Sequence, residues 1–189
     1  MNFINNDNES YILKKDKQNF INFCPSRGGI ITRWVHNSEN ILYFDKERFL
    51  NHSQSIRGGI PILFPICGTL DKPAFFGNNY LDFNQHGFAR DLEWQFSLDN
   101  KNKILNLILV SNQVTKKYYP FDFKLNIQIS FGIDSLEFSI SIKNHSRKKM
   151  PINFGLHPYF NISNFNKIEF INYPLDCQNQ KNNTVEASD

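Results

Sequence analysis

The sequence contains few cysteines. Only Cys24, Cys67 and Cys177 occur among its 189 residues, and they are odd in number and far apart. They form neither a CxxC pair nor the spacing of a zinc site, so a disulfide framework and a structural metal are not expected. Free thiols are usual in a reducing compartment, which predicts a cytoplasmic protein.

Long apolar runs and a strong excess of charge of one sign are also missing. No run approaches the roughly 18 consecutive apolar residues of a membrane span, and residues 1–16 hold no apolar signal core. Lys and Arg number 21 against 18 Asp and Glu, a net charge of +3. The densest basic run, Arg147-Lys148-Lys149, is typical of a solvated turn. Neither a membrane nor a nucleic acid is therefore predicted as a partner.

The sequence also lacks the apolar repeat of about 3.6 residues that is typical of a helix. No segment repeats apolar residues with that period over three or more turns, and the best candidate, residues 45–52, is only a turn or two long. The dominant period is two, which is typical of strands with one buried face. Residues 124–131 and 136–143 alternate in this way around a short turn at 132–135, which predicts an antiparallel hairpin.

Further short strands are predicted along the rest of the chain. They cover residues 30–35, 41–44, 92–98, 105–109 and 167–173, with turns between them. Many short strands separated by turn signals predict an all-β fold, an antiparallel β-sandwich or barrel. The length predicts one domain over residues 1–189, whose polar tail, residues 179–189, is expected to be disordered.

Residues 55–80 break the alternation. This segment mixes large apolar residues with Gly58, Gly59, Pro61, Pro65 and further glycines and prolines. Prolines lack the N–H that a central strand needs, yet the segment is too apolar for a solvated loop. Buried irregular backbone is costly because its polar groups must find partners, so such a segment usually lines a site.

Three short clusters carry candidate site residues, and the first is Arg57-Gly58-Gly59-Ile60-Pro61. Two glycines let the backbone approach a ligand closely, and an arginine offers a planar fork of donors to a phosphate or to vicinal hydroxyls. Taken alone, the cluster is better explained as a tight turn with a surface arginine.

The second cluster is Gln85-His86-Gly87-Phe88-Ala89-Arg90. His86 is a candidate donor or acid at a polar ligand, although a loop histidine bonded to backbone explains it as well. Arg90 is a candidate ligand contact, and it is explained equally well as the ion-pair partner of a neighbouring carboxylate, Asp91 or Glu93.

The third cluster is Phe154-Gly155-Leu156-His157-Pro158-Tyr159-Phe160. The proline forces His157 into an extended conformation, and the aromatic neighbours surround it with apolar surface. An imidazole that titrates near neutrality suits proton transfer in either direction, whereas a core histidine with a satisfied N–H is about as good an explanation.

Together, and in this order, the three clusters resemble the aldose 1-epimerase family, the galactose-mutarotase-like proteins. The chain is most similar to the branch of hexose-6-phosphate mutarotases, of the glucose-6-phosphate 1-epimerase type. The resemblance runs from about residue 23 to about residue 170 and is carried by the three clusters, with Phe64-Pro65, Gly68 and Trp94 between them. It implies a large antiparallel supersandwich that binds a hexose or hexose phosphate in an open cleft.

The resemblance also implies an activity and its residues. Such proteins are isomerases of carbohydrate metabolism that interconvert the α and β anomers of a hexose, with neither metal nor organic cofactor. His157 would protonate the ring oxygen, and His86 would be the second histidine, a donor to the sugar. Arg57 and Arg90 would contact the ligand or its phosphate, and Gln54 is a weaker candidate for a sugar hydroxyl.

The chain departs from the family in one respect. The family's general base is a glutamate far downstream of the second histidine, whereas here Glu169, Asp176 and Glu186 follow His157 in contexts that do not match it. We therefore expect a C-terminally truncated member with an incomplete sandwich. The alternative function is a non-catalytic sugar-phosphate-binding β-sandwich, and open sheet edges would favour self-association.

Overall fold

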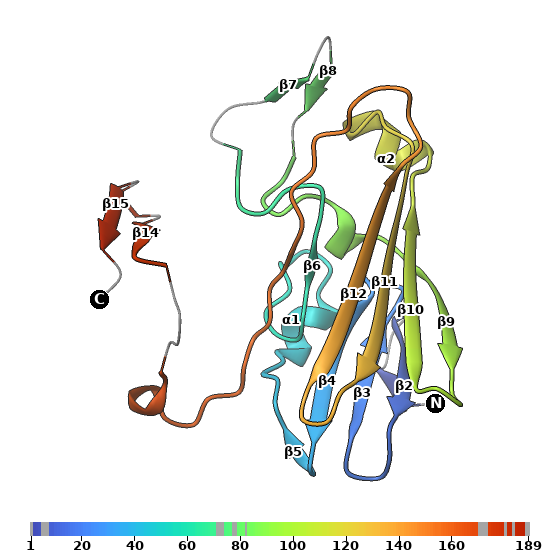
Figure 1. Ribbon diagram of the computed structural model, residues 1–189, viewed down its shortest axis with the longest axis vertical. Helices are drawn as coiled ribbons and strands as arrows, with labels where there is room; N and C mark the ends of the chain where they lie inside the picture. Colours follow the sequence, from blue (N-terminus) through green and yellow to red (C-terminus); the bar gives the residue numbers. More distant parts are fainter. Residues whose placement is uncertain are drawn as a thin grey trace.

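The computed structural model describes residues 2–4, 8–70, 74–76, 79–81, 83–169, 174–179, 181–182 and 184–187. Two antiparallel sheets dominate the fold (Figure 1), one five-stranded and one four-stranded. The five-stranded sheet consists in order of β1 (Asn2–Ile4), β2 (Asn8–Lys14), β3 (Phe20–Cys24), β4 (Ile30–His36) and β5 (Glu39–Asn40). The four-stranded sheet consists in order of β12 (Leu136–Asn144), β11 (Phe123–Phe131), β10 (Ile104–Val110) and β9 (Gln95–Asp99). The predicted all-β sandwich is confirmed.

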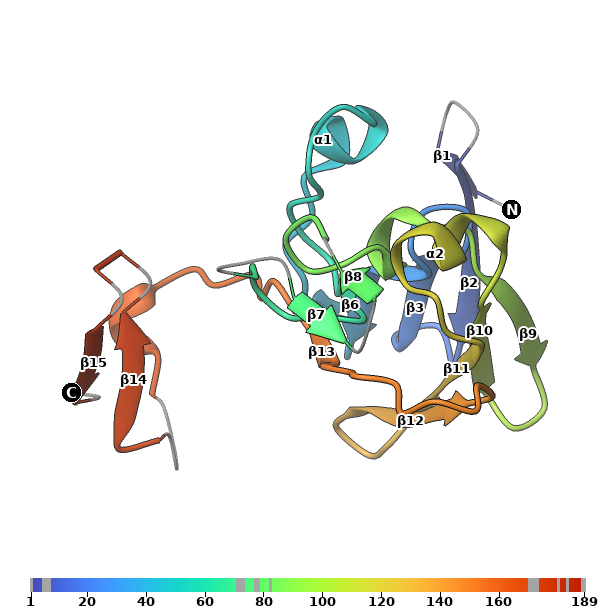
Figure 2. The same cartoon turned by 90° about the horizontal axis from the view of Figure 1, so that it is seen from above.

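The alternating sequence explains the core between the two sheets. In β11, Leu125, Ile127 and Ile129 are fully buried, while the residues between them are partly exposed. Their cluster includes Ile21 and Phe23 from the five-stranded sheet, so both layers contribute to one core (Figure 2). Each fully buried side chain of this size stabilises the fold by about 1.5–3 kcal/mol relative to an exposed one.

The central hairpin forms as its pattern predicts. β11 and β12 pair over their full length, from Phe131 opposite Leu136 at the turn to Phe123 opposite Asn144 at the far end. β4 and β10 also cover the predicted strands at 30–35 and 105–109. The predicted helical turn at 45–52 is α1 (Lys46–Leu50), which begins after Asp45, whose carboxylate accepts a hydrogen bond from the Arg48 N–H.

Three predicted strands differ from the structure. Residues 41–44 do not form a strand, because Leu42 and Phe44 each make a single bridge to a distant loop, at Phe160 and Gly58. The strand that pairs with β4 is instead β5, which lies in the turn expected between residues 35 and 41. β9 starts only at Gln95, because the Trp94 indole N–H bonds to the Ala89 carbonyl and its backbone N–H to Pro25. Of residues 167–173, residue 167 ends a 3₁₀ turn, η2 (Phe165–Lys167), and residues 170–173 lie outside the described residues.

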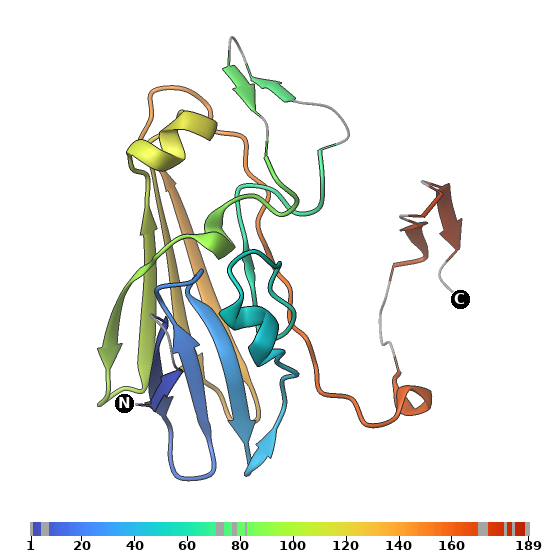
Figure 3. The same ribbon diagram turned by 180° about the vertical axis from the view of Figure 1, so that it is seen from behind.

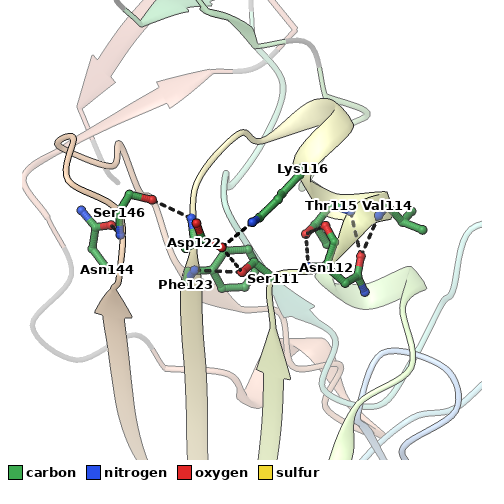
Figure 4. Close-up of polar contacts among 9 residues, drawn as sticks. All are labelled: Ser111, Asn112, Val114, Thr115, Lys116, Asp122, Phe123, Asn144 and Ser146. Carbon is green, nitrogen blue, oxygen red and sulfur yellow. Dashed lines mark hydrogen bonds and ion pairs between the residues drawn. The ribbon is translucent and has the colours of Figure 1, made fainter.

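A short helix that the sequence pattern did not predict, α2 (Gln113–Tyr118), joins β10 to β11. Its start is a capping box (Figure 4): the Asn112 side chain accepts from the N–H groups of Val114 and Thr115, while the Thr115 hydroxyl accepts from the Asn112 N–H. Side-chain caps of this kind stabilise a helix by about 1 kcal/mol. The signal lies in Asn112 and Thr115, because six residues are too few to show a helical period.

The end of α2 is tied to the sheet by Asp122. Its carboxylate forms an ion pair with Lys116 at 2.6 Å and accepts from the Ser111 hydroxyl at 3.3 Å (Figure 4). Its backbone N–H donates to the Ser146 hydroxyl just beyond β12. These contacts hold the ends of β10, β11 and β12 in register.

Three short two-stranded pairs complete the set of strands in the described chain. β6 (Ile62–Leu63) pairs with β13 (Gly155–Leu156), β7 (Ala74–Phe76) pairs with β8 (Asn79–Leu81), and β14 (Asp176–Asn179) pairs with β15 (Thr184–Ala187). The last hairpin stands apart from the sandwich in both side views (Figures 1 and 3). β15 lies within residues 179–189, the tail that the sequence predicts to be disordered. That residues 1–189 form one domain with a disordered tail stays a prediction. None of the helices in the described part of the chain has the length and apolar character that crossing a bilayer requires.

Candidate functional site

A pocket of about 150 Å³ opens where the irregular segment of residues 55–63 meets two later segments of the chain. Residues 85–90, which lead into the 3₁₀ turn η1 (Ala89–Asp91), form a second wall, and residues 157–159, just after β13, form a third. Its lining residues are Ser55, Ile56, Arg57, Pro61, Leu63, Gln85, His86, Arg90, His157 and Tyr159.

The first wall depends on two glycines. Gly58 and Gly59 have φ values of 118° and 67°, which side-chain-bearing residues rarely adopt. A Cβ on Gly59 would lie 2.4 Å from the Ile31 carbonyl oxygen, and one on Gly58 would lie 2.5 Å from the Cα of Phe44. The pair therefore lets residues 57–61 press against the sandwich, with Arg57 on the pocket side.

The second wall presents His86 in an unusual backbone conformation. Its φ is 71°, and the next residue, Gly87, has the same value. The His86 backbone N–H donates to the Gly68 carbonyl at 2.7 Å, and the Gly68 N–H donates to His86 Nδ1 at 2.9 Å. Because Nδ1 accepts this bond, the proton of the neutral ring lies on Nε2, which is left as a donor.

The charge state of His86 follows from its surroundings. Burial is the first cause that lowers its pKa from the ordinary value of 6.5, and the nearby Arg90, His157 and Arg57 lower it further. Burial disfavours the charged imidazolium, and positive neighbours repel it. His86 is therefore a neutral hydrogen-bond donor at pH 7.

The third wall is held in place by backbone hydrogen bonds to the first. The His157 N–H donates to the Pro61 carbonyl at 3.0 Å, and the Tyr159 N–H donates to the Gly59 carbonyl at 2.9 Å. In an extended segment, residues two apart face the same side, so His157 and Tyr159 both line the pocket. Their rings stack with centroids 4.8 Å apart.

The two histidines meet inside this pocket. The ring centroids of His86 and His157 lie 5.7 Å apart, with an interplanar angle of 72°. Arg57 reaches the same region, where its Nη1 donates a long hydrogen bond of 3.5 Å to the Tyr159 hydroxyl. Two imidazoles and a guanidinium thus surround a space in which a polar ligand would meet several hydrogen-bond donors.

Positive charge prevails in the pocket. Arg57 and Arg90 are lining residues, whereas none of the ten lining residues is an aspartate or glutamate. Arg90 is held by a 2.8 Å bond from its Nη2 to the Gln85 carbonyl and by Asp91, whose carboxylate lies 3.8 Å from its Nε. Two guanidinium groups without a lining carboxylate favour an anionic ligand.

A buried arginine, Arg27, bonds to the chain next to the first wall. Arg27 is 5% exposed, and its Nη2 donates to the Gln54 carbonyl at 3.2 Å while its guanidinium lies 5.0 Å from the centroid of the Phe49 ring. This buried cation supports the chain just before Ser55, where the first wall begins. Gln54 itself is exposed and is not a lining residue.

The structure thus brings together four of the five residues that the sequence pointed to: His86, His157, Arg57 and Arg90. Their roles stay predictions. Sequence reasoning gave no role to Tyr159, although its position two residues after an extended histidine was the available signal. Among the described residues, no three His, Cys, Asp or Glu side chains gather in a way that could hold a metal ion.

The acidic residues that follow His157 lie outside the pocket lining. Glu169 is exposed, and Asp176 and Glu186 belong to the separate β14–β15 hairpin (Figure 3). The Glu186 carboxylate accepts hydrogen bonds from the side chains of Thr184, Asn182 and Asn179. These bonds lower the pKa of Glu186, and the bond from Thr184 has the largest effect. It is occupied within its own hairpin.

Both the sequence and the fold are similar to those of known proteins. Residues 10–182 match the aldose 1-epimerase family. A relative from Cenchrus ciliaris named "Putative glucose-6-phosphate 1-epimerase" is 29% identical over 155 residues, covering 75% of this chain and 44% of that relative. A protein of the same name from Salmonella typhimurium is 25% identical over 134 residues and is covered to 41%. The chain thus spans less than half the length of these relatives.

Solved structures show the same architecture. The Slr1438 protein from Synechocystis superposes with a TM-score of 0.86 at 35% identity, covering 100% of this chain and 67% of that one. A galactose mutarotase related enzyme from Lactobacillus acidophilus superposes with a TM-score of 0.67 at 25% identity, covering 85% of this chain and 52% of that one. Galactose-mutarotase-like sandwiches therefore share the arrangement of sheets described above.

Proposed function

The chain belongs to the aldose 1-epimerase family, and from this premise we propose that it binds a hexose or hexose 6-phosphate and interconverts the α and β anomers. The observation that carries the proposal is the meeting of His86 and His157, 5.7 Å apart, in a pocket lined by two arginines. Three segments distant in sequence build this arrangement, and a purely structural role does not require their polar side chains to converge.

Each group has a role that suits its environment. His157, stacked on Tyr159, is the proposed acid that protonates the ring oxygen as the sugar ring opens. His86 has its Nδ1 occupied by the Gly68 N–H, so it acts as a donor to the sugar through Nε2 and cannot serve as the base. Arg57 and Arg90 are proposed to bind the phosphate, since guanidinium groups pair with phosphate oxygens through charge-assisted bonds.

A second function has an observation of its own. Removal of the proton from the anomeric hydroxyl requires a base, and no lining residue is a carboxylate. General-base catalysis typically contributes about 10²–10⁴-fold to a rate. The second candidate is therefore a sugar-phosphate-binding sandwich without turnover. For either function, three free cysteines support a cytoplasmic setting.

Anomer exchange measured by NMR separates the two functions. The purified protein is mixed with glucose 6-phosphate, or with free glucose or galactose, and exchange between α and β anomeric signals is compared with the spontaneous rate. His157→Ala is the test variant, and His145→Ala, which removes an exposed histidine outside the pocket, is the matched control. Epimerase activity predicts catalysed exchange that His157→Ala lowers by about 100-fold or more and His145→Ala leaves unchanged.

The other outcomes are equally informative. Saturable shifts of the sugar phosphate signals without catalysed exchange would establish the binding function and refute the epimerase. Neither shifts nor exchange with any of the sugars would refute both. Arg57→Lys should weaken binding of glucose 6-phosphate more than binding of glucose, because a lysine loses the planar fork that matches a phosphate.

A further inference from the structure

β12 is an edge strand whose outer backbone groups can be assigned. At one end of the hairpin the Gly132 N–H donates to the Ser135 carbonyl, and at the other end the His145 N–H donates to the Asp122 carbonyl. Hydrogen-bonded pairs alternate along an antiparallel ladder, so the odd-numbered residues of β12 point their N–H and C=O groups at β11. The even-numbered residues, from Leu136 to Asn144, therefore present theirs to the outer edge. Among the described residues, no strand pairs with that edge.

The core face of the sheet continues onto this edge. Ile140 lies opposite Ile127 of β11, and Phe138 and Ile142 lie opposite Ile129 and Leu125. The β11 residues are fully buried, whereas Ile140 is 40% exposed. The apolar row is therefore only partly covered where it reaches β12, which is the arrangement that favours edge-to-edge pairing.

The edge is held ready to pair. At the turn, the Lys15 ammonium donates to the Gly132 carbonyl at 2.7 Å, and His36 lies 3.5 Å from the Asp134 carboxylate. At the far end of β12, the Asn144 side chain donates to the Lys148 carbonyl at 2.8 Å. Anchoring at both ends lowers the entropy that the strand would lose on binding a partner.

The solvent face of β12 carries a charge pattern that selects the partner. Glu137 and Lys143 are exposed, and neither takes part in an ion pair of the described residues. Within the chain Lys143 lies opposite Lys124, which is a like-charge pair, and Glu137 lies opposite Ser130. The two charges sit three residues on either side of Ile140, the middle residue of the strand. The strand is therefore complementary in charge to an antiparallel copy of itself.

We propose that β12 pairs with β12 of a second copy of this chain, antiparallel and about a two-fold axis at Ile140. This register aligns the strands over their whole length and gives every outward N–H and C=O a partner. It pairs Phe138 with Ile142 and Glu137 with Lys143, twice each by symmetry, and closes the apolar row across the two copies. A shift of two residues, the smallest that keeps the outward groups paired, places both charges opposite serine or histidine.

Charge exchange tests the register. Sedimentation and light scattering over a roughly hundredfold concentration range should show a monomer–dimer equilibrium for the unaltered chain. Glu137→Lys and Lys143→Glu should each raise the dimer dissociation constant by about tenfold or more, because each replaces attractive pairs by like-charge pairs. The double variant Glu137→Lys/Lys143→Glu should restore it. Glu93→Lys, the same charge change at an exposed residue outside β12, is the matched control and should leave it unchanged.

Amide hydrogen exchange tests the edge directly, with an internal control in the same strand. The amides of Phe138, Ile140 and Ile142 should gain protection as the dimer forms, whereas those of Ser139 and Ser141, bonded to β11, should be protected at all concentrations. A monomer at every concentration, oligomers larger than a dimer, or failure of the double variant to recover dimerisation would each overturn the proposal.

Discussion

Adding one methyl group beside His86 should show how the second wall of the pocket is built. Gly87 and Gly68 both adopt a positive φ, 71° and 83°, so alanine at either position carries a backbone strain of about 1–2 kcal/mol. The two positions differ in the space around the new Cβ. At Gly87 it would lie 2.3 Å from the Phe64 carbonyl oxygen, whereas at Gly68 nothing lies within 4 Å.

The Phe64 carbonyl cannot move away from a new Cβ without weakening two hydrogen bonds that it accepts. It accepts hydrogen bonds from the N–H groups of Phe88 at 3.0 Å and Ala89 at 3.2 Å, and the Phe64 side chain is fully buried. Forcing additional atoms into a packed site costs about 1–3 kcal/mol. Gly87→Ala should therefore lower the free energy of unfolding by about 2–5 kcal/mol and Gly68→Ala by about 1–2 kcal/mol.

Urea unfolding followed by circular dichroism measures this difference, and thermal unfolding gives a second reading. For a chain of this size each kcal/mol corresponds to about 2–4 °C in Tm. Gly87→Ala should therefore melt lower than Gly68→Ala by about 2–12 °C. Equal losses for the two variants, or a larger loss for Gly68→Ala, would refute the argument that close backbone approach, rather than φ alone, requires glycine at position 87.

The His86 imidazole and the Tyr119 hydroxyl should each have a measurable effect on stability. The lowered pKa of His86 predicts an NMR titration midpoint below 6.5. As the pH falls below 6.5, this histidine becomes protonated in the unfolded chain but stays neutral in the folded chain, so the free energy of unfolding decreases until the pH reaches the folded pKa. His86→Asn should remove this part of the pH dependence. Tyr119→Phe removes the 2.7 Å hydrogen bond from a buried hydroxyl to the Pro151 carbonyl and should cost about 0.5–1.5 kcal/mol in urea unfolding, whereas Tyr118→Phe, at a side chain that is 56% exposed, should cost nothing measurable.

The hairpin of β11 and β12 could be predicted from the sequence because strand alternation is a local property. Side chains two apart share a face whatever the rest of the chain does, so the row from Leu125 to Ile129 indicates both the strand and its buried side. α2 could not be predicted in the same way, because its only signal is the capping pattern of Asn112 and Thr115, which has no repeat along the sequence. Leu42 and Phe44 were misassigned because distant loops, rather than a neighbouring strand, pair with them.

The candidate site was partly predictable for a different reason. Gly58 and Gly59 lie in the segment of residues 55–80, whose composition fits neither a central strand nor a solvated loop, and both have a positive φ and a close backbone neighbour. Gly87 shares these two properties, although its own cluster also fits an ordinary loop. The convergence of His86 and His157 is a property of the tertiary fold, and only the family resemblance suggested it. The tautomer of His86 depends on the Gly68 N–H, a contact that no sequence pattern reveals.

The backbone bonds between the first and third walls also fix when the pocket comes into being. His157 and Tyr159 bond to Pro61 and Gly59, about a hundred residues earlier, so the third wall can form only after those late residues leave the ribosome. Translation proceeds at about 5–20 residues per second, so several seconds separate the emergence of His86 from that of Tyr159. During that interval a nascent chain has two walls and no pocket. A ligand of this site would therefore stabilise the finished sandwich and could not guide its early folding.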